Sequence, residues 1–322
     1  MIKKLLLSVA GATLLVTSPV GAQELKEINF GIISTESSQN LRSEWQPILD
    51  DMAKKTGAKV NAFFASDYAG IIEGMRFNKV HIAWFGNKSA MEAVDRANGE
   101  VFAQMVNADG TQGYYSHLIV HKDSPLKSLD DMLKQGKSLS FGNGDPNSTS
   151  GFLVPSYYVF AQNKIDPKTF FKLQRGANHE ANALAVANKQ VDVATNNSEN
   201  LEKVKDRLPE KFKDLRIIWT SPLIPLDPLV MRKDLPEATK AKVRDFFYTY
   251  GQGGDMEKEN LYKLSKLSGF KVSTNNQLTP IRQLELFKNR NKLEADANLA
   301  EADKQVKLAE IDKQLAALSL AK

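Results

Sequence analysis

The sequence predicts an α/β fold of about two domains with mostly parallel sheets. Short runs of β-branched and aromatic residues, bounded by turn residues, alternate with longer runs of helical periodicity. Strands that alternate with helices at this spacing are typical of parallel sheets buried on both faces. The length of 322 residues suits about two domains, and the 42% hydrophobic content suits packed cores.

The predicted elements follow one another from residue 28 to residue 250. Each strand is a short apolar run, and each helix places apolar side chains three or four residues apart. The strands are expected at 28–34, 60–65, 82–85, 101–106, 118–121, 139–141, 191–195, 215–219 and 228–232. The helices are expected at 39–55, 68–78, 87–98, 129–135, 151–163, 180–188, 197–208 and 236–250. Turn clusters at 142–147 and 221–228 interrupt this pattern, and we expect the chain to cross between domains near Tyr115 and Pro222.

The C-terminal segment differs in composition from the rest of the chain. From Ile281 to Lys322 it is rich in Ala, Lys, Glu, Leu and Gln and has no Gly or Pro, which predicts one long helix, or two. Four apolar residues at 3-4-3 spacing form a seam: Leu308, Ile311, Leu315 and Leu318. Either the body of the same chain or a second copy covers this seam. The same register meets Lys304 and Glu301, which argues against a long coiled coil.

The first 22 residues have the pattern of a secretory signal. Lys3 and Lys4 precede an apolar run at 5–16, and Val20-Gly21-Ala22 places small residues before a cleavage site after Ala22. The apolar run is shorter than the roughly 20 residues that span a bilayer. We therefore expect a soluble mature protein in the periplasm.

Composition excludes several classes of function. The chain has no cysteine, which excludes a disulfide scaffold, a thiolate zinc site, an iron–sulfur cluster and a cysteine nucleophile. The 43 Lys and Arg against 38 Asp and Glu give a net charge of +5, and the two signs are interspersed. We therefore expect no nucleic-acid partner.

Two motifs are poor candidates for metal or nucleotide binding. His117 and His121 are four residues apart, but the Leu-Ile-Val between them favours a strand, and no Glu follows His117. The turn at 142–147 begins like a dinucleotide loop, but Asn147 replaces the third glycine and no Lys follows for a P-loop. We expect no metal and no cofactor.

The segment Asn147-Ser148-Thr149-Ser150-Gly151 is the most informative in the chain. It follows a predicted strand and turn and precedes an amphipathic run, so it is expected to begin a helix. Three hydroxyls, the free N–H groups of the first turn and the helix dipole together suit a tetrahedral oxyanion. The alternative is that one hydroxyl caps the helix and the other two are incidental.

Other candidate ligand residues lie in loops that join strands and helices, where ligand sites of α/β proteins gather. They are Tyr68, Tyr114 with Tyr115, His179, Glu199 and Asp227. Taken alone, each acidic residue is more often a helix cap or a solvated charge. A hydrolase built on Ser150, His179 and Asp227 is also conceivable, but the G-x-S-x-G elbow of such enzymes is missing.

Eight segments together carry a family resemblance. They lie at 29–37, 61–65, 67–72, 74–78, 141–155, 183–197, 221–225 and 280–287. They closely resemble the phosphonate-binding protein of bacterial phosphonate ABC transporters. The resemblance covers nearly the whole predicted mature chain, and its most specific part is the Asn-Ser-Thr-Ser-Gly motif in its long context.

This resemblance implies a two-lobed periplasmic binding protein fold of type II, with two chain crossovers, ligand in the cleft and a long C-terminal helix. The expected division is 1–22 signal peptide, 23–115 and 222–280 lobe 1, 116–221 lobe 2, and 281–322 helical extension.

The resemblance also implies a ligand site with two poles. Ser148, Thr149 and Ser150 would hold the phosphonate oxygens, with Tyr114 and His179 as further donors. Tyr68, Glu199 and Asp227 would face the amino end of an aminoalkylphosphonate such as 2-aminoethylphosphonate. This division is physically sound, because a phosphonate dianion needs N–H and O–H donors and an ammonium needs carboxylates.

Two residues depart from the family pattern. Tyr115 stands where relatives have Trp, and Leu226 stands where they have Gly. We expect Leu226 to narrow the cleft beside Asp227.

These observations predict a binding protein, not an enzyme. It would close its lobes on a phosphonate and deliver it to an inner-membrane ABC permease with its ATPase. The alternatives are a sensor subunit for a membrane kinase and, less favoured, a serine-dependent hydrolase. The C-terminal seam and the resemblance also favour a homodimer formed through the C-terminal helix.

Overall fold

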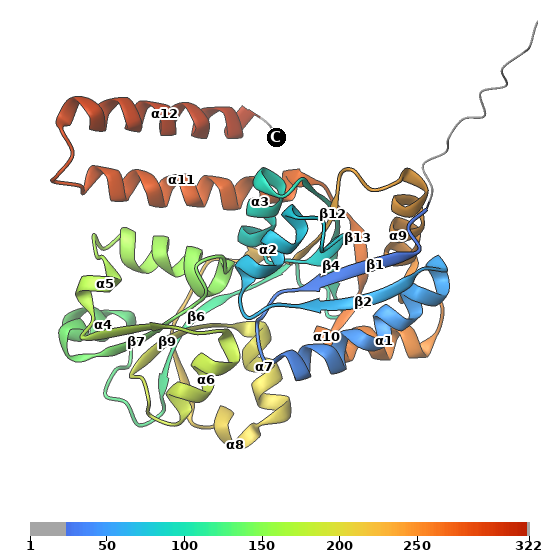
Figure 1. The fold of residues 1–322 in the computed structure, drawn as a ribbon. Coiled ribbons are helices and arrows are strands. Elements are labelled where there is room, and N and C mark those ends of the chain that lie inside the picture. Colours follow the sequence, from blue (N-terminus) through green and yellow to red (C-terminus); the bar gives the residue numbers. More distant parts are fainter. Residues whose placement is uncertain (1–23, 321–322) are drawn as a thin grey trace, which may run out of the picture.

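The computed structural model describes residues 24–320, whose strands form two large sheets and a short ribbon (Figure 1). The strand orders are β13-β4-β12-β3-β1-β2, β10-β6-β9-β7-β8 and β11-β5. The strands are β1 (Glu27–Ile32), β2 (Lys59–Phe64), β3 (Ile82–Trp84), β4 (Gly99–Asn107), β5 (Gly113–Tyr114), β6 (Ser116–His121), β7 (Ser140–Asn143), β8 (Leu173–Gly176), β9 (Val193–Asn197), β10 (Leu215–Thr220), β11 (Ile224–Pro225), β12 (Pro228–Arg232) and β13 (Leu267–Val272). The predicted signal peptide and its cleavage site lie outside the described residues.

Helices pack against both large sheets (Figure 1). They are α1 (Ser38–Thr56), α2 (Tyr68–Arg76), α3 (Asn87–Arg96), α4 (Leu129–Gln135), α5 (Pro167–Phe170), α6 (His179–Ala187), α7 (Ser198–Arg207), α8 (Pro209–Phe212), α9 (Glu237–Thr249), α10 (Asp255–Ser265), α11 (Thr279–Glu294) and α12 (Glu301–Leu320). The 3₁₀ turns η1 (Gly136–Ser138) and η4 (Asn275–Leu278) and the π-helical segments η2 (Thr149–Leu153) and η3 (Ser156–Ala161) complete the chain. We call the part built on the six-stranded sheet the first lobe and the part built on the five-stranded sheet the second lobe.

The large sheets are mixed, so the prediction of mostly parallel sheets is wrong. β1 pairs in parallel with β2 and β3, and β7 with β8 and β9. β6 and β12 are antiparallel to both of their neighbours. Each of these two strands enters its sheet from the other lobe, at the edge where the parallel strands end. Ser116 at the start of β6 therefore lies opposite Asn197 at the end of β9.

The chain crosses between the lobes twice, as expected for this fold. Tyr115 joins β5 to β6, and Pro222 lies between β10 and β11. The two passages are held together where Ile224 of β11 pairs with Tyr114 of β5. Two adjacent extended passages are a suitable hinge, because small changes in their dihedral angles move one lobe against the other.

Each lobe has its own aromatic core. In the first lobe the ring of Phe30 lies 5.0 Å from that of Trp45 and 6.1 Å from that of Phe247. In the second lobe Phe141 stacks on Phe171, with ring centroids 4.5 Å apart. Burying an aromatic side chain of this size stabilises a fold by about 1.5–3 kcal/mol. The two cores therefore hold the strand ends of each lobe in fixed positions.

The C-terminal segment forms two helices, α11 and α12, which lie side by side as a hairpin (Figure 1). The seam predicted on α12 is its least exposed face: Leu308 is buried, and Ile311, Leu315 and Leu318 are half-buried. α11 of the same chain therefore covers this seam. None of the helices between residues 24 and 320 is long and apolar enough to cross a membrane.

Candidate functional site

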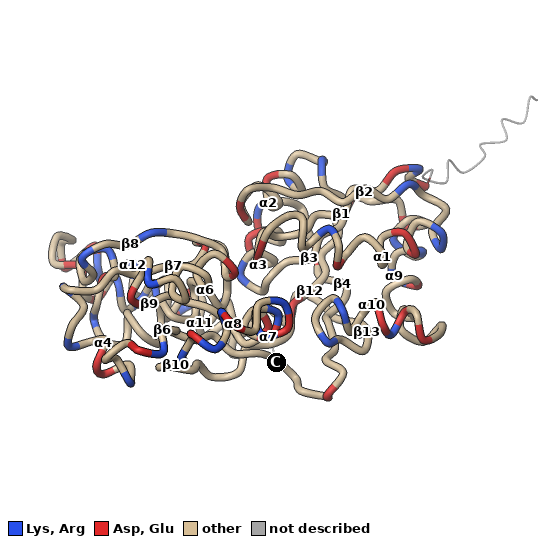
Figure 2. The backbone as a smooth tube through the Cα atoms, turned by 90° about the horizontal axis from the view of Figure 1, so that it is seen from below, with Lys and Arg blue, Asp and Glu red and all other residues tan. Residues whose placement is uncertain are grey.

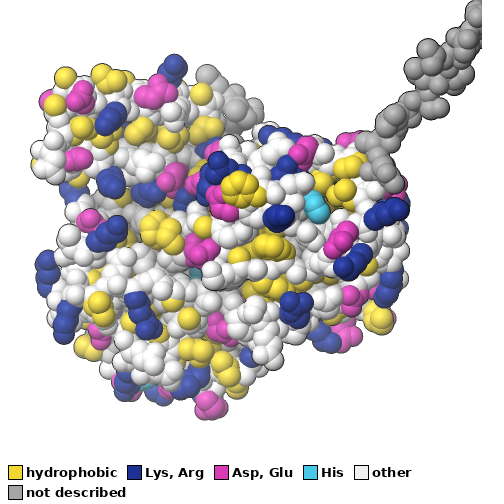
Figure 3. Space-filling view, in the orientation of Figure 1, with side chains coloured by type: hydrophobic (Ala, Val, Ile, Leu, Met, Phe, Trp, Pro, Cys, Tyr) yellow, Lys and Arg dark blue, Asp and Glu magenta, His cyan; other side chains and the backbone are white. Residues whose placement is uncertain are grey.

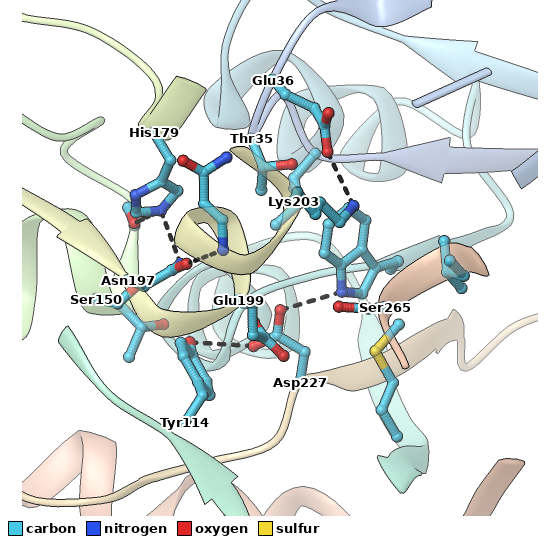
Figure 4. A pocket seen from close by; sticks show the side chains of 18 of the residues that line it. Thr35, Glu36, Tyr114, Ser150, His179, Asn197, Glu199, Lys203, Asp227 and Ser265 are labelled. Carbon is cyan, nitrogen blue, oxygen red and sulfur yellow. Dashed lines mark hydrogen bonds and ion pairs between the residues drawn. The ribbon is translucent and has the colours of Figure 1, made fainter. Parts of the chain in front are cut away.

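A cavity of about 40 Å³ lies where the two lobes meet, and all eight predicted ligand residues line it (Figure 4). They are Tyr68, Tyr114, Ser148, Thr149, Ser150, His179, Glu199 and Asp227. Tyr68, Ser148, His179 and Glu199 follow the carboxyl ends of β2, β7, β8 and β9, in that order. The sheet topology thus brings together residues up to 159 positions apart in the sequence.

The three consecutive hydroxyls are fixed by three different amide donors. Ser148 Oγ accepts from the Gly151 N–H at 3.0 Å, and Thr149 Oγ1 accepts from the Lys88 N–H at 2.8 Å. Ser150 Oγ accepts from Asn197 Nδ2 at 3.0 Å. Because each oxygen already accepts an amide proton, each hydroxyl acts through its O–H, which in Ser148 also lies 3.4 Å from His179 Nε2. Three such donors suit the three oxygens of a tetrahedral oxyanion.

Thr149 also caps a helix of the other lobe. α3 begins after Gly86, which has no side chain to accept from the free N–H groups of the first turn. The Thr149 hydroxyl takes that place when it accepts from the Lys88 N–H. The anion pole is therefore completed by the N-terminus of α3.

The segment that carries the hydroxyls is a π-helix, where the sequence predicted an α-helix. Pro155 has no N–H for the Gly151 carbonyl, and the Gly144 N–H bonds that carbonyl instead at 3.1 Å. The Leu153 N–H reaches back five residues to the Ser148 carbonyl. A Cβ on Gly144 would lie 2.4 Å from the Gly151 carbonyl oxygen, so the close approach requires glycine.

Asn197 connects Ser150 to His179. Its Oδ1 accepts from the Asn200 N–H at 2.7 Å, so its Nδ2 is the donor to Ser150 and lies 3.3 Å from His179 Nε2. Burial lowers the pKa of His179 to about 4, so the imidazole is neutral at pH 7. With Nε2 as an acceptor, the ring proton lies on Nδ1.

The opposite wall of the cavity is acidic. Asp227 accepts from Trp84 Nε1 at 3.1 Å and from the Tyr114 hydroxyl at 3.2 Å (Figure 4). Burial, and then the nearby Glu199 carboxylate, raise the pKa of Asp227 well above its ordinary value. Burial raises the pKa of Glu199 to about 7, while Lys203 lowers it. Both carboxyl groups would be stabilised in their ionised form by a cation placed between them.

The two poles are close together. A Cβ built on Gly86 would lie 3.2 Å from Thr149 Oγ1 and 3.9 Å from Asp227 Oδ1. These two oxygens are therefore separated by at most about 7 Å. A ligand that reaches both poles needs only a short spacer.

Two sequence expectations fail in the site. Leu226 packs in the core of the first lobe at 3% exposure and is not among the residues that line the cavity, so it does not narrow the cleft. Asp227, the next residue, lines the cavity, whereas Leu226 belongs to the core. Tyr115 is 40% exposed and lines a neighbouring groove, not this cavity.

The structure does not form the Ser150, His179 and Asp227 arrangement of the alternative hydrolase. Asp227 bonds to Trp84 and Tyr114, not to His179, and His179 Nε2 lies 3.4 Å from Ser148 and beside Asn197. A serine hydrolase needs the serine, histidine and acid joined in one hydrogen-bonded chain. Among residues 24–320, no group of His, Asp and Glu side chains is placed to hold a metal ion.

Sequence reasoning missed Trp84, Asn197 and Lys88. Trp84 and Asn197 each end a strand, β3 and β9, and the rule that ligand sites gather at strand ends could have indicated both. Lys88 contributes through its backbone N–H, which no side-chain pattern reveals.

A two-lobed α/β chain that encloses a small polar cavity between its lobes is a substrate-binding protein of the type II periplasmic class. Comparison with known proteins agrees. The family described as "ABC transporter, phosphonate, periplasmic substrate-binding protein" matches residues 30–278, and the chain belongs to it. It is thus a periplasmic phosphonate-binding component of an ABC transporter and not an enzyme.

Individual relatives support this assignment. The phosphonates-binding periplasmic protein of Escherichia coli (strain K12) is 62% identical over 288 residues, which cover 89% of this chain and 84% of the relative. A binding protein component of an ABC phosphonate transporter from Pseudomonas aeruginosa has 58% identity and a TM-score of 0.90, covering 92% of this chain and 98% of that chain. A Prochlorococcus marinus (MIT 9301) protein in complex with methylphosphonate has 22% identity and a TM-score of 0.71, covering 80% and 97%, and shows likeness of fold.

Proposed function

We propose that this protein captures aminoalkylphosphonates, of which 2-aminoethylphosphonate is the simplest probe. The observation that carries the proposal is the set of three hydroxyls, Ser148, Thr149 and Ser150, each of which already accepts an amide proton. They present three O–H donors to one oxyanion, and Glu199 and Asp227 stand across the cavity for an ammonium.

The separation of the poles supports a short ligand. Thr149 Oγ1 and Asp227 Oδ1 are at most about 7 Å apart, which suits a phosphonate and an ammonium joined by two carbons. A Cβ on Gly86 would intrude between them, so the glycine keeps this passage open.

The acidic pole supplies discrimination against inorganic phosphate. Phosphate offers oxygens to the hydroxyls but no cation to Glu199 and Asp227. The two carboxyl groups then remain desolvated without a counter-charge, which costs free energy only in the complex with the wrong ligand.

Calorimetric titration with 2-aminoethylphosphonate, ethylphosphonate and phosphate tests this function. We expect 2-aminoethylphosphonate to bind most tightly. Glu199→Gln or Asp227→Asn should weaken it by more than about thirtyfold, since removing one partner of a buried charge pair costs about 2–5 kcal/mol. Ethylphosphonate should bind those variants as well as the wild type, or better. Equal weakening of both ligands would assign the carboxylates a structural role instead.

We further propose that the loaded protein delivers its ligand to the permease of the transporter. Deletion of the chromosomal gene should abolish uptake of radiolabelled 2-aminoethylphosphonate by cells, and the wild-type copy should restore it. A sensor subunit would instead leave uptake intact once the transporter is expressed from a constitutive promoter.

Dimerisation through 281–322 is a separate proposal. Because α11 covers the seam within the chain, a dimer would use the outer face of α12, where Val306 is 70% exposed, or exchange α12 between copies. Light scattering of the full-length protein at high concentration tests it, and a monomeric mass refutes it.

A further inference from the structure

Four charged side chains close the cleft just behind the acidic pole. Lys203 of α7 lies 2.9 Å from Glu36 and 2.6 Å from Glu44, which belong to the first lobe. Arg207, one turn further along α7, pairs with Glu36 as well and lies 3.7 Å from Glu44. Figure 4 shows the bond between Lys203 and Glu36 at the edge of the cavity, and Figure 2 shows α7 where the two lobes meet. We call these residues the interlobe cluster: Glu36, Glu44, Lys203 and Arg207.

Three of the four side chains in the interlobe cluster are largely buried, so solvent screens their ion pairs only weakly. The side chains of Glu36, Glu44 and Lys203 are only 1%, 12% and 16% exposed. Burial alone would raise the pKa of Glu36, but Lys203 and Arg207 hold it below its ordinary value. Burial lowers and the two glutamates raise the pKa of Lys203, with a net rise. Glu36 and Lys203 therefore keep their charges in the closed cleft, whereas burial, together with the nearby Glu36, raises the pKa of Glu44 above its ordinary value.

Lys203 has a second carboxylate within reach on its own helix. Glu199 precedes it by four residues on α7, and a Glu four residues before a Lys is the favourable order for a helical ion pair. Yet in the described part of the chain Lys203 forms its ion pairs with Glu36 and Glu44, and it acts on the Glu199 carboxylate only from a longer distance, where it lowers the pKa of that group. In the closed cleft Lys203 therefore forms its ion pairs with Glu36 and Glu44 and not with Glu199.

A ligand reaches the cavity only when the lobes part, because side chains of both lobes enclose it. When they part, Glu36 and Glu44 move away with the first lobe, while Lys203 and Glu199 remain together on α7. Lys203 is then left with the carboxylates of its own helix, among which Glu199 stands at the favourable position four residues before it and Asp206 pairs with Lys266 in this structure. Closure reverses the exchange and leaves Glu199 in need of a cation.

We infer that Lys203 exchanges partners on closure, from Glu199 to Glu36 and Glu44, and that this exchange makes closure depend on a ligand cation. The inference rests on the proposed function and deepens it, since it assigns specificity to ion pairs between the lobes, two members of which, Glu36 and Lys203, also line the cavity. Glu36, Glu44 and Lys203 are positioning residues. A ligand ammonium replaces Lys203 at Glu199, whereas a ligand without an amine leaves Glu199 unpaired as the cleft closes.

The test is a selectivity ratio, the Kd of ethylphosphonate divided by the Kd of 2-aminoethylphosphonate. Glu44→Gln removes one first-lobe carboxylate, so Lys203 stays partly with Glu199 in the closed form. We expect the ratio to fall about tenfold, within the usual range of coupling between sites. The matched control is Glu202→Gln. Glu202 lies on α7, as Lys203 does, and the substitution breaks its 2.8 Å ion pair with Lys266 of the first lobe. It should change both Kd values alike and leave the ratio within about twofold.

For Arg207→Met we expect the selectivity ratio to stay the same or to rise. The substitution leaves both glutamates to Lys203 alone, so the ratio should equal or exceed that of the wild type even if both ligands bind more weakly. If Glu44→Gln does not fold by circular dichroism, Glu44→Asp keeps the charge but shortens its reach, and a severalfold fall is expected.

Each outcome decides. A fall in the ratio with Glu44→Gln, but with neither Glu202→Gln nor Arg207→Met, supports the exchange. An unchanged ratio, or an equal fall in all three variants, overturns it and leaves a general latch between the lobes. If the wild type binds neither ligand, the proposed function fails and the exchange fails with it.

Discussion

Replacing Thr149 by alanine should weaken every phosphonate by about two to four orders of magnitude. Two losses add up in the closed form. A hydrogen bond to a charged group contributes about 1.5–3 kcal/mol, and a buried N–H left without a partner costs about 1–3 kcal/mol. The second loss arises at Lys88, whose N–H at the start of α3 donates 2.8 Å to the Thr149 hydroxyl across the cleft. Together they amount to about 2.5–6 kcal/mol, at 1.4 kcal/mol for each tenfold in Kd.

Calorimetry on a matched series measures this effect. Thr149→Ser keeps the hydroxyl and should stay within about tenfold of the wild type, whereas Thr149→Val keeps the shape and should behave like alanine. The anion pole is common to both probes, so 2-aminoethylphosphonate and ethylphosphonate should weaken by similar factors. A folded Thr149→Ala variant that binds within threefold of the wild type would refute the reasoning, as would a loss confined to one of the two ligands.

Three further predictions concern protons, space and the C-terminal hairpin. Burial raises the pKa of Glu199 to about 7, and an ammonium favours the ionised carboxylate. Binding of 2-aminoethylphosphonate should therefore release protons, and its affinity should increase as the pH rises from about 6 to 8. Calorimetric titration in buffers of different ionisation enthalpy measures the number of protons released. Glu199→Gln should reduce that number. Gly86→Ala should weaken the binding of both probes at least about tenfold, because the new Cβ would lie 3.2 Å from Thr149 Oγ1. The melting temperature should change little, because the φ angle of Gly86 is ordinary for an alanine. Unchanged Kd values would contradict this prediction. A chain that ends at residue 296 should keep its affinity within about twofold, because α12 packs on α11; a large loss in titration would place α12 in the binding mechanism.

The sequence predicted those elements whose side chains are buried on a regular period. β1, β3, β6 and β12 are nearly continuous apolar runs in the sequence, and the structure buries them. β8 and β13 were missed because they are edge strands: half of their residues or more are exposed, so no apolar run marks them. The strand directions were mistaken because they depend on which lobe a strand comes from, and local pattern does not record that.

The candidate site divides in the same way. Ser148, Glu199 and Asp227 were found because polar residues at strand ends are visible in the sequence. Trp84 was missed because an aromatic residue in a strand is usually part of a core, and only the fold places its Nε1 beside Asp227. Lys203 looks like any solvated lysine on a helix, and its burial against two glutamates comes from the opposite lobe.

Charge is distributed unevenly between the two poles, and this has a consequence for specificity. Under the proposed function the donors to the oxyanion are hydroxyls and amides, and His179 beside them is neutral. Lys203, which lines the cavity, pairs with Glu36 and Glu44, and on the face shown in Figure 3 Lys and Arg lie interspersed with acids. Without a full positive charge at the anion pole, a phosphate gains no excess attraction there over a phosphonate. Under the proposed function, selection then comes from the acidic pole and the interlobe cluster behind it.

The division of residues between the lobes sets an order of events. Ser148, Thr149, Ser150 and Glu199 all belong to the second lobe, so this lobe alone can hold a phosphonate and approach its ammonium in the open form. Closure then adds Asp227 and the N-terminus of α3 from the first lobe, together with the glutamates that take Lys203. Under the proposed function, we therefore expect the anion contacts to form first and the contacts that recognise an amine to form last. Under the proposed function, we expect such a cleft to capture a ligand without an amine as well, and we expect the final, closing step to favour the aminoalkylphosphonate.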